Sequence, residues 1–175
     1  MKSILLIVAV GAVASAGCGG STAKKVVGSA SLGGVYRMDT RYGDDSTDPT
    51  PVPENYGHWI FALERGRFAF TQEYKDACTW GYGKLVVKGD EMAWTFTNGG
   101  GIAPTGAVNK PGEHFRYHWS RYRSTLSLSA VKVAGLPENE SSPTNFRAKP
   151  WHLVSTTPSK RYFSRKCPPP KEALR

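Results

Sequence analysis

Cysteine is scarce in this sequence. The chain of 175 residues has three, which excludes a small domain held together mainly by disulfide bonds. It also lacks the glycine repeat of collagen and the sustained heptads of a coiled coil. Hydrophobic residues make up 39% of the chain, a proportion and a length that suit one globular domain with a core.

Motifs of known catalysts are missing as well. No GxSxG motif is present to place a nucleophilic Ser on a strand-to-helix turn. The four His residues do not have the HExxH spacing of a zinc protease. His114 and His118 fall on a strand pattern, where four residues correspond to about 13 Å, so we expect a solvated strand face. The sequence therefore predicts no catalytic residue, no metal site and no cofactor, and a protein that is not an enzyme.

The N-terminus is organised like a secretory signal peptide. Lys2 precedes an apolar run from Ile4 to about Ala16, and small residues follow. This run is shorter than the roughly 17–25 residues of a membrane-spanning helix, which disfavours a retained transmembrane anchor. We predict that residues 1–17 are removed and that the mature protein is extracytoplasmic.

Two modes of cleavage fit this region. Ser15-Ala16-Gly17-Cys18 resembles the lipobox of bacterial lipoproteins, whose Cys becomes the lipidated first residue of the mature chain. The resemblance implies lipid attachment at Cys18, anchoring to the cell membrane, and a flexible Gly/Ser/Ala tether over residues 18–32. Ala14-Ser15-Ala16 also suits an ordinary signal peptidase, which would give a secreted protein. We favour lipidation, because a Cys directly after the apolar run is otherwise hard to explain.

Export would place Cys78 and Cys167 in an oxidising compartment, where they form the one internal pair available. Their disulfide would close a loop of about 90 residues and stabilise the fold by roughly 4 kcal/mol in the chain-entropy description. Cys/His spacings typical of zinc sites are absent. Pro168 to Pro170 follow Cys167 and form a stiff stretch that suits a covalent tie.

Apolar and polar residues alternate in segment after segment between residues 33 and 155, and helical periodicity is almost absent. The alternation predicts strands at 34–38, 58–63, 67–71, 82–87, 92–97, 115–120, 125–129 and 151–155. Short turns join six of them into three hairpins. Because closure removes both exposed sheet edges, we predict an all-β domain, residues 33–155, in which eight antiparallel strands form an up-and-down barrel. A β-sandwich is the alternative.

Some of these segments resemble lipocalin-like (calycin-type) barrels. Gly34-x-Tyr36 stands near the start of the first strand, where lipocalins carry Gly-x-Trp. The series Asn109-Lys110-Pro111-Gly112-Glu113, Phe115-x-Tyr117-x-Trp119 and Thr125-Leu126-x-Leu128 is similar to uncharacterised bacterial lipoproteins of that kind. The resemblance implies an extracytoplasmic module that binds a small, largely apolar molecule. It also implies an Arg that packs on the Tyr36 ring from beyond the last strand, for which Arg147 and Arg161 are the candidates.

Aromatic residues lie in phase on the apolar faces of the predicted strands and would converge inside a barrel. They are either the core itself, or several of them line a pocket for an apolar or aromatic ligand. The candidate ligand-binding residues are Tyr36, Trp59, Phe61, Phe68, Trp94, Phe96, Tyr117 and Trp119, and Phe70 shares their face.

Two loops match ligand-binding motifs only in part. Residues 99–106 are rich in Gly, but Ala107-Val108 follow where a P-loop requires Lys and Ser or Thr, so we expect a mobile loop at the barrel mouth. The acidic stretch Asp44 to Asp48 lacks the Gly and the terminal Glu of an EF-hand loop. A solvated acidic loop is the simpler interpretation.

The formal net charge of +9 is concentrated near the C-terminus. Residues 141–175 carry eight Lys or Arg and one Glu, whereas residues 18–140 carry 14 Lys or Arg and 13 Asp or Glu. The barrel is thus followed by a basic, Pro-containing segment, residues 156–175. Candidates for a basic surface are Arg147, Lys149, Lys160, Arg161, Arg165 and Lys166.

This basic surface supports an alternative function, a non-enzymatic envelope module that contacts a protein, an acidic wall polymer or anionic lipid head groups. A solvated basic tail is the simpler interpretation. Nucleic acid is not an expected partner, because export separates the protein from it and no RNP-like or zinc-finger motif is present.

Overall fold

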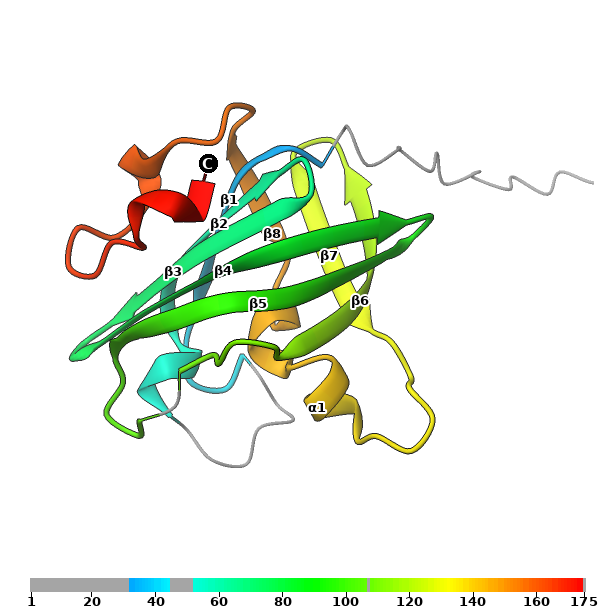
Figure 1. The fold of residues 1–175 in the computed structure, drawn as a ribbon, viewed down its shortest axis with the longest axis horizontal. Coiled ribbons are helices and arrows are strands. Elements are labelled where there is room, and N and C mark those ends of the chain that lie inside the picture. Colours follow the sequence, from blue (N-terminus) through cyan, green and yellow to red (C-terminus); the bar gives the residue numbers. More distant parts are fainter. Residues whose placement is uncertain (1–31, 45–51, 107, 175) are drawn as a thin grey trace, which may run out of the picture.

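In the computed structural model, which describes residues 32–44, 52–106 and 108–174, eight antiparallel strands form a closed barrel (Figure 1). The strands are β1 (Gly34–Thr40), β2 (Gly57–Glu64), β3 (Arg67–Tyr74), β4 (Ala77–Lys88), β5 (Glu91–Ile102), β6 (His114–Tyr122), β7 (Thr125–Ala130) and β8 (Trp151–Ser155). They follow one another around the barrel in sequence order, and β1 closes it by pairing with β8. The predicted up-and-down barrel is confirmed, and the sandwich alternative is wrong.

The three predicted hairpins are confirmed. Strands β2 and β3, β4 and β5, and β6 and β7 pair with one another, each pair across a short turn. Gly66 and Gly89 stand in the first two turns with φ of 73° and 60°. Glycine adopts this left-handed conformation at no steric cost, which is why these positions can reverse the chain tightly.

The expected glycine-rich loop is wrong over its first residues, because Gly99 to Ile102 continue β5 beside β4. Gly100 lies opposite Trp80, and a Cβ at Gly100 would stand 2.8 Å from Cζ2 of that ring. A Cβ at Gly101 would stand 2.1 Å from the Cys78 carbonyl oxygen. These glycines therefore permit close approach of two strands.

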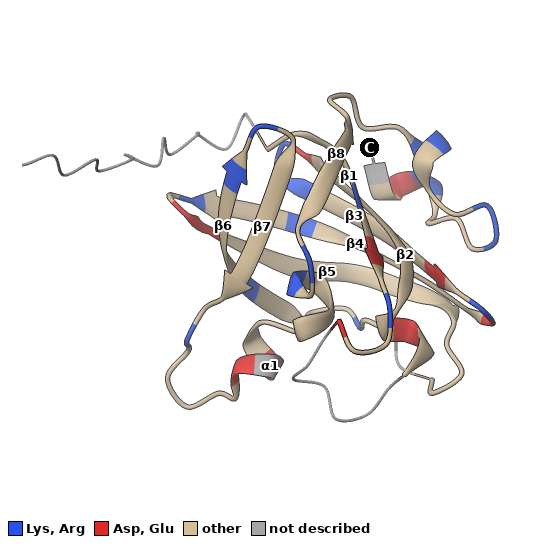
Figure 2. Ribbon diagram, turned by 180° about the vertical axis from the view of Figure 1, so that it is seen from behind, with Lys and Arg blue, Asp and Glu red and all other residues tan. Residues whose placement is uncertain are grey.

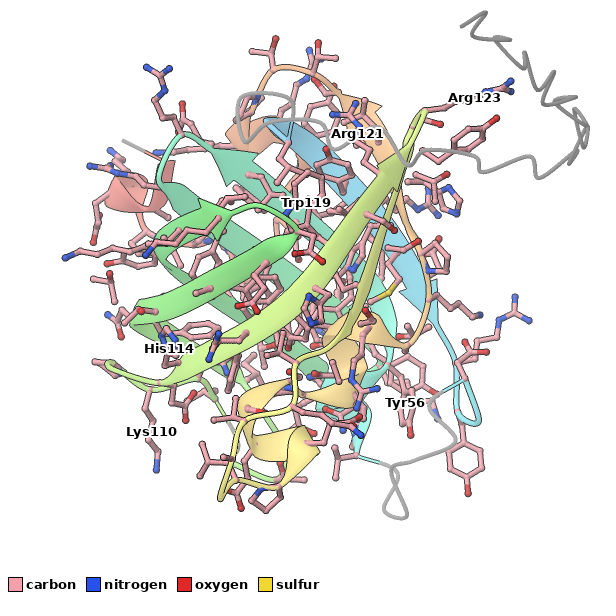
Figure 3. All side chains as sticks on the ribbon, turned by 90° about the vertical axis from the view of Figure 1, so that its right-hand side faces the viewer. Tyr56, Lys110, His114, Trp119, Arg121 and Arg123 are labelled. Atoms are coloured by element: carbon pink, nitrogen blue, oxygen red, sulfur yellow. A yellow bond between two sulfur atoms is a disulfide. The ribbon has the colours of Figure 1, made fainter. Side chains whose placement is uncertain are left out.

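The two ends of the barrel differ in their connections. At the tight-turn end lie the three hairpin turns, the start of β1 and the end of β8, where Val35 pairs with Ser155. At the opposite, long-loop end, the two-residue turn Lys75–Asp76 joins β3 to β4, and longer connections join β1 to β2, β5 to β6 and β7 to β8. They contain the helices η2 (Pro53–Asn55), α1 (Glu138–Ser141) and η3 (Thr144–Arg147). Figure 3 shows this polarity, with Arg121 and Arg123 near one end and Tyr56 and Lys110 near the other.

The interior of the barrel is packed with aromatic rings. Phe146, from η3, extends into this core from the long-loop end and is 1% exposed. Its ring centroid lies 5.3 Å from that of Trp59, 5.2 Å from that of Phe70 and 5.0 Å from that of Trp94. Phe146 therefore completes the core from the β7–β8 connection, where the alternating pattern predicted no strand.

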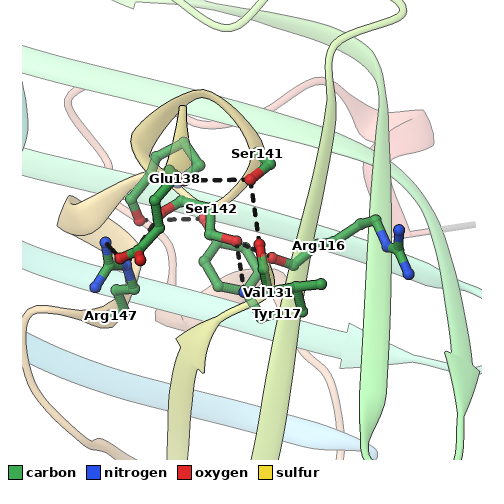
Figure 4. A network of polar contacts seen from close by, with 8 residues as sticks. Arg116, Tyr117, Val131, Glu138, Ser141, Ser142 and Arg147 are labelled. Atoms are coloured by element: carbon green, nitrogen blue, oxygen red, sulfur yellow. Dashed lines mark hydrogen bonds and ion pairs between the residues drawn. The ribbon is translucent and has the colours of Figure 1, made fainter. Parts of the chain in front are cut away.

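A network of polar contacts holds the β7–β8 connection so that Phe146 reaches the core (Figure 4). The Ser142 hydroxyl donates to the Arg116 carbonyl of β6 and accepts from the Val131 N–H at 3.1 Å. The Arg147 guanidinium donates to the Ser142 carbonyl at 3.0 Å and to the Glu138 carboxylate at 2.7 Å. Since Ser142 is fully buried, these bonds satisfy groups that would otherwise destabilise the fold.

Residues 156–174, the C-terminal strap, lie against the outside of the barrel (Figure 1). The strap contains η4 (Lys160–Tyr162) and η5 (Lys171–Leu174). Its Phe163 and Ala173 are buried in a cluster with Val35, Ile60 and Ala69 on the outer barrel face. Cys78 and Cys167 form the predicted disulfide, with their Cα atoms 6.0 Å apart. The strap is thus packed and covalently tied.

None of the helices among the described residues is both long enough and apolar enough to cross a bilayer.

Candidate functional site

The predicted ligand-binding residues lie inside the barrel, none of them more than 6% exposed. Their rings touch one another: centroids lie 4.7 Å apart for Phe61 and Trp94, and again 4.7 Å apart for Trp94 and Tyr117. Such contacts fit the interpretation of these residues as core. Trp59 differs, because it also lines a cavity at the long-loop end.

The Arg that packs on the Tyr36 ring is Arg121, on β6, with its Cζ 5.9 Å from the ring centroid. The candidates Arg147 and Arg161 are therefore wrong. Arg147 pairs with Glu138 at the long-loop end, and Arg161 lies over the Tyr162 ring. Residue 121 is in phase with the inward-facing Tyr117 and Trp119, so extending the two-residue period by one step would have found it.

Two core tyrosines use their hydroxyls as donors. Tyr36 donates to the Leu32 carbonyl at 3.0 Å, and Tyr117 donates to the Pro143 carbonyl at 3.2 Å. Burial raises the pKa of the Tyr36 hydroxyl, although the nearby Arg121 guanidinium opposes the shift. Burial also raises the pKa of Tyr117 well above its ordinary value, with a smaller opposing effect from Arg147. Both side chains are thus held neutral in the folded protein.

This predicts alkaline destabilisation. The unfolded chain releases these two protons near pH 10, and the folded protein only at higher pH. Below about pH 10, these groups should not change the free energy of unfolding. Above about pH 10, the free energy of unfolding should fall by up to about 1.4 kcal/mol per pH unit for each tyrosine. Urea unfolding at a series of alkaline pH values measures this slope. The Tyr36→Phe/Tyr117→Phe variant should have a shallower slope, and an unchanged slope would contradict the assignment.

A cavity of about 220 Å³ opens at the long-loop end, and we call it the Glu54 cavity. Its aromatic lining comes from Trp59, Phe70 and Phe115, which belong to or pack against the core cluster. The other lining residues are Val52, Glu54, Asn55, Thr79, Val108, Asn109, Glu113 and Asn145. The cavity thus combines an aromatic surface with carboxylate, amide and hydroxyl groups.

Glu54 is the unusual member of this lining, because its side chain is charged and yet only 5% exposed. Its Oε1 accepts two hydrogen bonds from Thr105, one from the backbone N–H and one from the hydroxyl, each at 2.8 Å. Its Oε2 is buried and has no hydrogen-bond partner in the described part of the chain. A buried carboxylate oxygen without a hydrogen bond destabilises the folded protein. This oxygen is therefore an acceptor that a ligand with a donor group can use.

Glu54 is held in place by the barrel wall. The Gln72 amide, fully buried on β3, donates to the Pro53 carbonyl at 3.1 Å and to the Tyr56 carbonyl. Thr79 on β4 in turn donates to the Gln72 side-chain carbonyl at 3.2 Å. These bonds fix both ends of η2, so the carboxylate stands on a rigid turn. Pro53 adds rigidity, because its ring restricts φ at the start of this helix.

The rim of the Glu54 cavity is polar. Asn145 Nδ2 donates to Asn55 Oδ1 at 3.3 Å, which links η3 to η2. Asn109 Nδ2 donates to Glu113 Oε2 at 3.2 Å, within the β5–β6 connection. Three connections distant in sequence thus meet around one opening, a place where proteins commonly position ligand contacts.

A second cavity, of about 330 Å³, lies at the tight-turn end. It is lined by Leu32, Gly33, Leu63, Glu64, Arg65, Gly66, Leu85 and Val87. Its apolar side chains are aliphatic. Among the described residues, no buried polar atom without a hydrogen bond belongs to its lining. It offers area to a ligand but no buried group that would orient one, so the Glu54 cavity is the better candidate site.

Figure 2 shows several blue Lys and Arg segments near the C-terminus of the chain. The predicted basic residues fall into two groups. Lys149 pairs with Asp44 at 2.5 Å at the long-loop end, as Arg147 does with Glu138. The remaining candidates belong to the C-terminal strap and are exposed: Lys160, Arg161, Arg165 and Lys166. Four of the six candidates thus lie within residues 160–166 of the strap and are exposed.

Several predictions concern residues outside the described ranges. These are the signal peptide, Cys18, the tether up to residue 31, and residues 45–48 of the acidic stretch. Asp44 is described: it accepts from the Arg41 N–H, and the hydrogen bond from Lys149 lowers its pKa. In the described ranges, His, Cys, Asp and Glu side chains form no group of three or more that could hold a metal ion.

Glu54 and Arg121 are the functional candidates that sequence reasoning missed. Glu54 stands in a polar, Pro-containing stretch that is typical of a solvated loop, and its burial depends on Thr105, 51 residues away.

The closed eight-stranded barrel is compatible with a lipocalin-like fold. The chain matches no protein-family model, no curated protein and no solved structure.

Proposed function

We propose that this chain is an exported, lipid-anchored, lipocalin-like protein that binds a small apolar or aromatic molecule in the Glu54 cavity. The observation that carries the proposal is the buried Glu54 carboxylate at the wall of a cavity lined by three aromatic rings, with one oxygen that has no partner among the described residues. The sequence interpretation placed the ligand among the rings of the barrel interior. Since those rings are packed together, the proposal moves the ligand to the end of the barrel.

The chemistry of the lining defines the class of ligand. Trp59, Phe70 and Phe115 favour a flat apolar body, and aromatic rings also attract cations. The free Glu54 oxygen requires a donor, which an ammonium group or a hydroxyl supplies. A volume of about 220 Å³ lies below the roughly 300–1,000 Å³ of pockets for drug-sized molecules. The ligand is therefore small, with one apolar or aromatic part and one amine or hydroxyl donor.

Export and anchoring have separate support. The first 18 residues carry a signal-peptide pattern that ends in a lipobox-like Cys18. The disulfide between Cys78 and Cys167 fits an oxidising compartment, since such bonds persist outside the cytosol.

Binding of matched probes tests the ligand class. 2-Phenylethylamine should quench the tryptophan fluorescence and bind more tightly than ethylbenzene, which has a similar ring but no donor. Glu54→Gln should reduce the amine affinity by tenfold or more, because charge-assisted hydrogen bonds contribute about 1.5–3 kcal/mol. The same change at Glu140, exposed at the same end of the barrel, is the control.

Native mass spectrometry of protein purified from its host gives an independent test, in which a bound small molecule is expected. Absence of any bound molecule, together with equal weak binding of both probes, would reject the Glu54 cavity as a ligand site.

A further inference from the structure

Among the described residues, the cations of the C-terminal strap differ from Arg147 and Lys149 at the long-loop end in having no acidic partner. In the described part of the chain, no carboxylate forms an ion pair with a cation of the strap. The exposed cations concerned are Lys160, Arg161, Arg165, Lys166 and Lys171. Two of them donate hydrogen bonds to neutral groups: Arg161 to the Tyr162 hydroxyl at 2.7 Å, and Lys166 to the Lys75 carbonyl at 2.7 Å. Glu172 is the only acidic residue of the strap.

The strap presents these charges from a fixed position. Its apolar side chains, Phe163 and Ala173, face the barrel and are at most 5% exposed. The Ser164 hydroxyl donates to the Glu73 carboxylate at 2.6 Å, and its N–H donates to the Thr71 hydroxyl at 3.2 Å. With the Cys167 disulfide, these contacts hold the apolar side inward. The outer side is left with uncompensated positive charge.

We propose that the outer surface of the C-terminal strap docks on the anionic phospholipid head groups of the membrane in which the chain is anchored. The proposal rests on the export and anchoring proposed above, and it is independent of the ligand. A bilayer fits this surface better than a protein does. Protein interfaces have cores rich in aromatic residues and poor in charge, whereas here the apolar groups of the strap are turned inward.

The path of the chain supports the same partner. The strap begins directly after β8, and Ser155 at the end of β8 pairs with Val35 at the start of β1. The segment leading from Cys18 therefore reaches the barrel beside the first residues of the strap. About 14 residues separate Cys18 from Leu32, and even fully extended they span about 50 Å at most. A lipid at Cys18 thus keeps the start of the strap within about 50 Å of the bilayer.

Docking in this way would restrict the orientation of the anchored barrel. The strap begins at the tight-turn end, where Ser155 pairs with Val35. Its middle lies beside the β3–β4 turn at the other end, because Cys167 is bonded to Cys78 and Lys166 donates to the Lys75 carbonyl. The strap therefore follows the side of the barrel, and docking would place this side against the bilayer.

The test uses the mature chain from residue 18 with Cys18→Ser, so that no lipid anchor contributes. Sedimentation with vesicles of phosphatidylcholine and phosphatidylglycerol in equal amounts should show binding at ~0.1 M salt. Binding should be lost toward ~1 M, where the screening length falls from about 10 Å to about 3 Å. Pure phosphatidylcholine vesicles should not bind.

Matched triple variants locate the binding surface. Arg161→Gln/Arg165→Gln/Lys166→Gln should reduce partitioning on the order of 100-fold, since each cation near an anionic bilayer contributes about fivefold. Lys88→Gln/Lys110→Gln/Lys132→Gln removes the same charge from exposed positions outside the strap and should reduce it less than threefold. Thermal unfolding of both variants confirms that the barrel is intact.

Equal losses in the two triple variants, or vesicle binding that survives high salt, would overturn the proposal. So would tight binding to soluble polyglutamate without binding to anionic vesicles, which would indicate an acidic polymer instead. The intact mass of the protein from its host reports the lipid on Cys18 separately. A lipidated protein whose strap does not bind vesicles refutes the docking surface and leaves the anchor in place.

Discussion

Replacing Phe146 with Ala is expected to lower the free energy of unfolding by about 3–5 kcal/mol, although this residue lies in an irregular connection. The ring is 1% exposed and lies within 5.3 Å, between centroids, of Trp59, Phe70 and Trp94. Truncation removes these contacts and leaves a cavity that the surrounding strands cannot fill. The backbone bonds remain, including the one from Trp151 Nε1 to the Phe146 carbonyl at 2.8 Å. The loss should therefore reflect packing alone.

Urea unfolding of the purified variant measures this change. Leu136→Ala is the matched control, because Leu136 belongs to the same connection and is 52% exposed, and its cost should stay within about 0.5 kcal/mol. Phe146→Leu should fall between the two. If Phe146→Ala were as mild as Leu136→Ala, η3 would not be part of the barrel core.

The barrel itself was predictable because its determinants are local. Along β6, Phe115, Tyr117 and Trp119 alternate with polar residues, and the turn after Tyr122 returns the chain in a pattern of the same period. A period of two specifies a strand and its inward face without knowledge of its neighbours. Short turns then specify antiparallel pairing, and the need to protect the sheet edges favours closure.

The parts that sequence reasoning missed depend on contacts between distant segments. Gly99 to Gly101 have no side chains to alternate, and the role of Gly100 and Gly101 depends on how closely Trp80 and Cys78 approach from β4. The Phe146 ring has no periodic neighbours, and its place in the core follows from the bonds of Ser142. A single residue in a loop carries no local sign of burial when its partners come from elsewhere in the chain.

The same reasoning applies to the candidate site. Trp59 was predicted as a ligand contact and does line the Glu54 cavity, because its inward position is a strand property. Glu54 could not be predicted, since a Glu between Pro53 and Asn55 is typical of solvent exposure. Its burial needs Thr105 from the β5–β6 connection, and the register that brings these two segments together is known only from the fold.

Removing the disulfide is expected to have an effect as large as that of truncating Phe146. In the chain-entropy description, a cross-link between residues 89 positions apart stabilises a protein by roughly 4 kcal/mol, because it restricts the unfolded chain. Cys78→Ala/Cys167→Ala should lower the free energy of unfolding by about that amount. A reducing agent should have the same effect on the unaltered protein, and Cys18→Ala should have none.

Removing the disulfide also has a local consequence, because Cys167 ties the strap to Cys78 on β4. Without the disulfide, the strap would be held only by noncovalent contacts, among them those of Phe163 and Ala173 and the hydrogen bonds of Ser164 and Lys166. Since an untied terminal segment can open without unfolding the barrel, backbone amides of residues 156–174 should exchange their hydrogens faster in the Cys78→Ala/Cys167→Ala variant, and those of β4 and β5 less so. Uniformly faster exchange, or an unfolding free energy that reductant leaves unchanged, would contradict this account. If the docking surface proposed for the strap depends on its fixed position, the same variant should also bind anionic vesicles less tightly while retaining every cation of the strap.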